Sequence, residues 1–90
     1  MQRCELHIIN KLGLHARAAA KFVSTASAFP CSIKVGRSAE QLSDGKNIMS
    51  VMMLAASKGT SLVLITDGEQ EEQAQAALID LVNRYFDEEQ

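Results

Sequence analysis

The chain has 90 residues, of which 47% are hydrophobic and 4% aromatic, and its formal charge is −2. This length and apolar content fit one small domain spanning residues 1–90 with a single core. The acidic balance and the few aromatics argue against nucleic-acid binding, which normally uses a basic face and, for RNA, aromatic side chains that stack on bases. No apolar run approaches the roughly 20 residues needed to cross a bilayer, so we expect no membrane insertion and a cytoplasmic location.

The two cysteines, Cys4 and Cys31, have neither CxxC nor Cys/His ligand spacing. In a sequence without a secretory signal they are most simply two buried thiols in a reducing compartment. We therefore predict free thiols, and neither a metal nor a cofactor.

The first half of the chain predicts a strand, a helix and two more strands. Apolar and polar residues alternate from 3 to 9, which is typical of a half-buried strand. From 16 to about 28 apolar residues recur at helical spacing, until a proline closes the segment. Alternation returns at 31–35, and a short strand at 40–42 is predicted to pair with it through a turn at 36–38.

The second half predicts a helix, a strand and a last helix. Asn47 is a good N-cap for a helix from 48 to about 55. The segment 61–66, SLVLIT, is apolar on both faces and indicates a well-covered strand whose register alternation cannot fix. A helix follows from about 70 to 86, and the acidic tail at 87–89 is predicted to be solvated. The predicted buried face of the last helix consists of Ala74, Ala77, Leu78, Leu81, Val82 and Tyr85.

The order of these elements is βαββαβα. It predicts an α+β fold, an open-faced sandwich in which a four-stranded, mostly antiparallel sheet carries three helices on one face.

His15 falls at the predicted N-cap of the first helix, where Ser, Thr, Asp or Asn is usual. A helix N-terminus presents unpaired backbone N–H groups, here those of Ala16, Arg17 and Ala18, and these make a ready site for phosphate. The guanidinium of Arg17 adds a fork of donors suited to phosphate oxygens. An imidazole at this place can act as a nucleophile, and the same amides and Arg17 would stabilise the phosphoryl group that it accepts. A histidine that merely caps the helix is the alternative.

The segment 10–17, NKLGLHAR, resembles the active-site signature of the HPr family, the histidine phosphocarriers of bacterial phosphotransferase systems. The resemblance continues through 46–49 and the turn at 58–60, so it covers nearly the whole chain. It implies that His15 takes a phosphoryl group from enzyme I and passes it to an enzyme IIA, and that Arg17 contacts this group. The protein would then be a phosphoryl carrier rather than an enzyme, and we expect a monomer.

The NKLGLHAR form and the ending FDEEQ most resemble the nitrogen-branch carriers of this family, called NPr. Asn47 stands where HPr proteins of Gram-positive type carry a regulatory serine, so control by a serine kinase is not expected there. Ser24, Ser27 and Ser50 stand where several sugar-branch relatives have lysines, which argues against strong binding to sugar-branch enzymes. Ala18 replaces a proline found in many relatives. Alanine keeps the helix and adds an N–H donor, so we expect the chemistry to survive.

The second helix has two apolar stripes. One stripe is Met49, Met52 and Met53, and the other is Ile48, Val51 and Leu54. If the second stripe faces the core, the methionines are left partly exposed, and flexible thioethers suit a surface that must fit more than one partner. We therefore predict a partner-binding surface formed by Ile48, Met49, Met52 and Met53. Ordinary core packing of the methionines is the alternative.

Two other functions are alternatives to a carrier. A non-catalytic regulatory module could bind an anionic ligand or a protein at the same helix terminus. An RNA-binding sheet is disfavoured by the acidity and by the lack of aromatics on the strands. His7, on the polar face of the first strand, is interpreted as a plain surface residue.

Overall fold

The structure is a computed structural model that describes residues 1–88. Within them the chain forms four strands, three α-helices and a short 3-10 turn, and the predicted α+β fold class is confirmed. The elements are β1 (Gln2–His7), α1 (Ala16–Ser27), β2 (Ser32–Ser38), β3 (Gln41–Asp44), α2 (Ile48–Met52), β4 (Ser61–Asp67), α3 (Glu71–Asn83) and η1 (Tyr85–Asp87). None of the helices in this part of the chain is long and apolar enough to cross a membrane.

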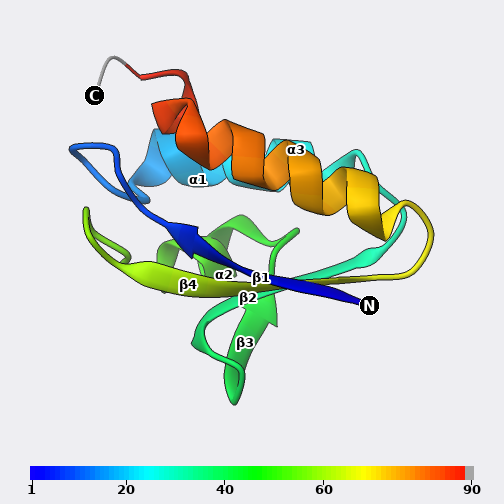
Figure 1. Cartoon of the computed structure of the whole chain (residues 1–90). Coiled ribbons are helices and arrows are strands. Elements are labelled where there is room, and N and C mark those ends of the chain that lie inside the picture. Colours follow the sequence, from blue (N-terminus) through cyan, green and yellow to red (C-terminus); the bar gives the residue numbers. More distant parts are fainter. Residues whose placement is uncertain (89–90) are drawn as a thin grey trace.

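The sheet has the strand order β1-β4-β2-β3, and every neighbouring pair is antiparallel. In β4, one of the two central strands, Leu62, Leu64 and Thr66 are buried, whereas Val63 and Ile65 are half-buried. Figure 1 shows α1 and α3 over one face of the sheet only. The apolar run of β4 therefore has one face that is buried and one face that is partly exposed to solvent. Its sequence is apolar on both faces and could not show which face is buried.

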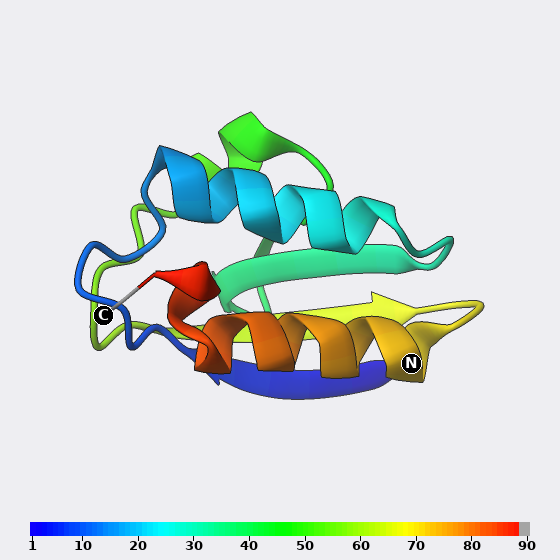
Figure 2. The ribbon, with the colours of Figure 1, turned by 90° about the horizontal axis from the view of Figure 1, so that it is seen from above.

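The core lies between the sheet and the two long helices. Figures 1 and 2 show α1 and α3 side by side across the sheet, and α2 contacts both α1 and β3. The largest fully buried apolar side chains are Phe22, Phe86, Ile8, Ile33, Leu62, Leu64 and Leu78. Burying a side chain of this size stabilises the fold by about 1.5–3 kcal/mol, so this layer fixes the two helices relative to each other.

The turn predicted at 36–38 is wrong, because β2 continues through Ser38 and β3 begins at Gln41. A β-bulge lies between Gly36 and Ser38. A Cβ on Gly36 would lie 1.9 Å from the backbone oxygen of Gln41. The glycine is therefore needed for a close approach of two paired strands, not for a turn.

The last helix ends at Asn83, three residues before the predicted end at Phe86. Tyr85, Phe86 and Asp87 all have positive φ angles, of 59°, 54° and 62°. This left-handed turn buries Phe86 completely and leaves Tyr85 exposed, so the prediction that Tyr85 belongs to the buried face is wrong. Burial of the phenylalanine ring, worth about 1.5–3 kcal/mol, offsets part of the cost of the left-handed backbone, which is about 1–2 kcal/mol for each residue.

The second helix is also shorter than predicted. It ends at Met52, and Ala55 adopts a left-handed conformation with φ 50°. The predicted N-cap is confirmed, because Asn47 Oδ1 accepts a hydrogen bond from the Ser50 backbone N–H at 3.1 Å. A helix of five residues is too short to bury all of Ile48, Val51 and Leu54 against the core, and Ile48 remains 39% exposed.

Candidate functional site at the start of α1

The loop between β1 and α1 is pinned to the loop that follows α2. The Leu14 backbone N–H donates to the Ala56 oxygen at 2.8 Å. Gly13 has φ 66°, and a Cβ there would lie 2.4 Å from the same Ala56 oxygen. Only glycine fits this left-handed, crowded position without strain. His15, which follows, therefore enters α1 from a fixed direction.

His15 is the N-cap residue of α1, as predicted, with φ −72° and ψ 177°. Its side chain makes no capping hydrogen bond. The first helical bond joins the Ala19 N–H to the His15 oxygen at 2.8 Å, so the N–H groups of Ala16, Arg17 and Ala18 have no partner within the helix. The ring thus lies at the positive end of the helix dipole, beside amides that can bind an anion.

A shallow hollow surrounds the histidine. It is lined by Lys11, Leu12, His15, Ala16, Arg17, Lys21, Asp87 and Glu88. Its charges are three cations and two carboxylates. The Arg17 side chain is exposed and makes no ion pair or side-chain hydrogen bond within residues 1–88. Its guanidinium can therefore offer its fork of donors to an incoming anion.

The tail of the chain returns to this site, and the prediction that it is solvated is wrong for Glu88. The Glu88 carboxylate contacts His15 Nε2 through Oε2, and its side chain is only 14% exposed. Its Oε1 accepts a hydrogen bond from Asn10 Nδ2 at 2.9 Å. Asp87 is exposed, in agreement with the prediction, and residue 89 lies outside the described residues.

The environment of Glu88 keeps its carboxylate ionised. Burial raises the pKa of Glu88, but the hydrogen bonds from Asn10 and His15 and the charges of His15 and Lys21 outweigh this effect. The net pKa of Glu88 therefore lies below its usual value. An ionised carboxylate can only accept hydrogen bonds, so His15 Nε2 must donate to it.

The final turn is anchored to α1. Lys21 Nζ donates to the Phe86 backbone oxygen at 2.8 Å and lies 3.8 Å from an Asp87 carboxylate oxygen. Arg84 Nη1 forms an ion pair with Asp87 at 2.6 Å. Together with the buried Phe86 ring, these contacts place Glu88 on the histidine. No local sequence pattern could have indicated it, since 73 residues separate Glu88 from His15.

An exposed apolar surface lies on α2 and its C-cap. The exposed fractions are 39% for Ile48, 65% for Met49, 38% for Met52 and 80% for Met53. Val51 and Leu54 are buried, whereas Ile48, the third member of that stripe, is partly exposed and lies with the methionines. Leu12, which the sequence analysis missed, adds a side chain that is 66% exposed in the wall of the hollow.

The comparisons with known proteins identify the family. A family model described as "PTS HPr component phosphorylation site" matches residues 2–84. The chain is 61% identical to the phosphocarrier protein HPr of Pseudomonas aeruginosa and 51% identical to that of Neisseria meningitidis serogroup B, each match covering 98% of both chains. The chain belongs to the HPr family. Among solved structures, HPr from Thermoanaerobacter tengcongensis superposes with a TM-score of 0.93 at 42% identity, over the full length of both chains.

Membership of the HPr family settles the broad function. The protein is a phosphocarrier of a phosphotransferase system, a phosphoryl-group carrier and not an enzyme, and its family implies enzyme I and an enzyme IIA as partners. The alternatives of a regulatory anion-binding module and of an RNA-binding sheet are therefore not favoured.

His7 and the two cysteines do not line the hollow around His15. His7 is exposed, and its Nδ1 is 2.8 Å from the Ser61 hydroxyl. Both cysteines are free. Cys31 is buried and Cys4 is half-buried. Burial raises the pKa of the Cys4 thiol, and a hydrogen bond from Gln75 lowers it by less, so the net pKa is raised. Among residues 1–88 no three His, Cys, Asp or Glu side chains gather closely enough to hold a metal ion.

Proposed function

We propose that His15 is the phosphoryl acceptor and that Nδ1 is the reacting nitrogen. In the neutral ring, the proton that Nε2 donates to Glu88 leaves Nδ1 unprotonated, with a free lone pair. This lone pair attacks phosphorus, the P–Nδ1 bond forms, and the bond from phosphorus to the donor breaks with its electron pair leaving on the donor. The position of His15 at the open N-terminus of α1 is the observation that carries the proposal.

The phosphoryl group of about −2 charge would be held by the first-turn amides and by Arg17. We assign the backbone N–H groups of Ala16, Arg17 and Ala18 and the guanidinium of Arg17 to this role. The arrangement attracts the group more strongly than it attracts the bare imidazole, yet each contact is a hydrogen bond that a partner can replace. Such a site suits a carrier that must receive the group and give it away.

We assign the exposed side chains of Ile48, Met49, Met52 and Met53 to the surface that binds enzyme I and the enzyme IIA, and we extend it to Leu12. An apolar centre beside a polar reacting group is typical of protein interfaces.

The nitrogen branch is the proposed pathway class. Ser24 and Ser27 are exposed on α1, and the half-buried Ser50 lies on α2, so the first two present hydroxyls where a basic patch would require lysines. The NKLGLHAR signature also supports this branch. Transfer rates to purified enzymes IIA of both branches would test the assignment. Faster transfer to a sugar-branch enzyme would overturn it.

The acceptor assignment is tested by incubation with enzyme I and phosphoenolpyruvate. We expect wild type to gain one acid-labile, base-stable phosphate and His15→Ala to gain none. His7→Ala is the matched control, because it removes the other histidine from an exposed strand position. Losing an N-cap side chain that makes no capping bond should cost about 0.5 kcal/mol or less, so circular dichroism should show a folded variant. Labelling of folded His15→Ala would disprove the assignment.

A further inference from the structure

We propose that Glu88, held in place by Asn10, is a positioning residue for phosphoryl transfer. Its carboxylate accepts the Nε2 hydrogen of His15, which fixes the tautomer that presents Nδ1 and orients the ring toward the open helix end. This inference rests on the proposed role of His15 as acceptor.

The three side chains form a continuous relay. Asn10 is fully buried, and its Nδ2 donates both to the Gly13 oxygen at 2.8 Å and to Glu88 Oε1 at 2.9 Å. The other carboxylate oxygen of Glu88 contacts His15 Nε2. Both oxygens of one carboxylate are therefore occupied, and the partner that holds it is itself fixed to the loop before α1. This is how an imidazole is oriented by a carboxylate in catalytic triads.

Asn10 is better explained by this relay than by stability. Its Oδ1 is buried and accepts no hydrogen bond from any of residues 1–88. Burying an unpaired amide oxygen costs about 1–3 kcal/mol, which an apolar residue would avoid. What the asparagine supplies is an amide donor that can bond the loop and the carboxylate at once.

Within residues 1–88, Glu88 forms no ion pair with the lysines or the arginine that line the hollow. The charged side chains that line the hollow with it are Lys11, Arg17, Lys21 and Asp87. Asp87 pairs with Lys21 and Arg84, whereas Arg17 is left without an ion pair in the described part of the chain. Glu88 is held on the histidine although an arginine lines the same hollow. The arginine thus remains available for the phosphoryl group.

The chemistry of transfer explains why a carboxylate is useful at Nε2. When Nδ1 gives its lone pair to phosphorus, the proton on Nε2 stays and the ring becomes cationic. Glu88 stabilises that charge from the nitrogen opposite the phosphoryl group, so its own negative charge does not face the phosphate directly. In the onward step the P–Nδ1 bond breaks and the ring takes back the electron pair, which a cationic imidazole does readily.

The test compares Glu88→Gln with wild type in transfer from phosphorylated enzyme I. We expect the rate for Glu88→Gln to fall about tenfold, the size expected for loss of one charge-assisted hydrogen bond. Glu88→Asp should recover part of the rate, because it restores the charge on a shorter side chain. Glu72→Gln, an exposed change on α3 outside the hollow, is the matched control and should behave as wild type.

The second measurement reports on the tautomer rather than on the rate. Nitrogen-15 chemical shifts of the His15 ring should show Nε2–H in wild type and a mixture of tautomers in Glu88→Gln. An unchanged rate, or a lower rate with an unchanged tautomer, would overturn the positioning role while leaving the acceptor assignment intact. If the acceptor assignment itself fails, His15→Ala is still labelled, which is a different result.

Discussion

Arg17 is the residue whose substitution tests the anion site most directly. Its guanidinium offers phosphate oxygens two parallel donors, whereas a lysine offers a point charge. We expect transfer rates to decrease from wild type through Arg17→Lys and Arg17→Ala to Arg17→Glu. Loss of charged hydrogen bonds should reduce the rate of Arg17→Ala by about 10- to 100-fold. The first-turn amides remain in every variant, so some transfer should persist.

The series is measured as single-turnover transfer from phosphorylated enzyme I to each Arg17 variant. Because the side chain is exposed and has no ion pair within residues 1–88, the stabilities of all four proteins in urea should differ by no more than about 1 kcal/mol, the size of a charge effect in the first turn of a helix. Equal rates for wild type and Arg17→Glu would show that the amides alone, or groups of the partner, hold the phosphate.

At the scale of residues, the sequence revealed what local chemistry determines. His15 at the helix start and Asn47 as an N-cap follow from rules that act within one turn, and the structure places both as predicted. Asn10 and Glu88 could not be found in this way, because their roles depend on the C-terminal turn folding back over α1. In the sequence, Asn10 cannot be told from a solvated loop residue, because its burial depends on a partner that is distant along the chain.

At the scale of elements, α2 carries the proposed docking surface, and Met49→Asp or Met53→Asp should weaken it. These side chains are 65% and 80% exposed, so each change should alter the free energy of unfolding by no more than about 0.5 kcal/mol. A charge in the apolar centre of an interface should slow transfer about tenfold or more. Ala76→Asp on α3 is the matched control, since it adds the same charge at another exposed helix position.

Stopped-flow transfer from enzyme I, with urea unfolding alongside, measures both quantities. Wild-type transfer by a stably folded Met53→Asp would place the docking surface elsewhere. A large loss of stability would instead show that the methionines belong to the core.

Element types were predictable because hydrophobic period distinguishes helix from strand, but several boundaries were not. Gly36 reads as a turn signal, yet it permits a close approach of β2 and β3 that only the paired strand reveals. Phe86 fits the helical pattern of α3, but burying its ring requires a left-handed turn that ends the helix earlier. In both places tertiary packing overrode the local preference.

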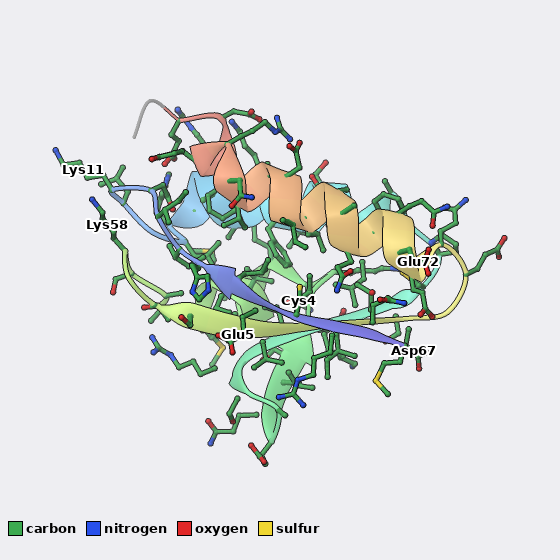
Figure 3. All side chains as sticks on the ribbon, in the orientation of Figure 1. Cys4, Glu5, Lys11, Lys58, Asp67 and Glu72 are labelled. Carbon is green, nitrogen blue, oxygen red and sulfur yellow. The ribbon has the colours of Figure 1, made fainter. Side chains whose placement is uncertain are left out.

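At the scale of the whole molecule, its two ends carry different charged groups. Figure 3 shows Lys11 and Lys58 at the end to which the C-terminal segment returns, and Asp67 and Glu72 at the opposite end. The end that carries Asp67 and Glu72, called here the acidic end, also holds the N-terminal amine. The Met1 amine lies 2.7 Å from a Glu71 carboxylate oxygen and 3.6 Å from one of Asp67. This contact joins β1 to α3 far from the proposed phosphoryl site.

The contact at the acidic end should make stability depend on pH in two windows. The hydrogen bond from the Met1 amine, followed by that from the Gly68 N–H, holds the pKa of Glu71 below its usual value. The same bond to Glu71 raises the pKa of the Met1 amine. The carboxylate therefore contributes stability above its unfolded pKa of about 4.3, and this is lost as pH falls through the lower folded value. The amine contributes stability below about pH 8, and this is lost as pH rises through its higher folded value.

Glu71→Gln should flatten both windows, because the amide has no negative charge to offer the amine. We expect its free energy of unfolding, measured in urea from pH 3 to 10 at low salt, to lie below that of wild type in the plateau, to converge with it at low pH and to lie closer to it at high pH. Glu88 adds to the acidic window in wild type and in the variant alike, since its pKa is also lowered. The acidic difference between the two proteins therefore reports the contacts of Glu71 with Met1 and Gly68, whereas the alkaline difference reports the Met1 amine. Screening by salt should shrink this difference, because both groups lie near water. Parallel pH profiles for the two proteins would show that the N-terminal ion pair does not contribute to stability. Phosphoryl transfer should be the same in both, since the pair lies at the end of the molecule opposite His15.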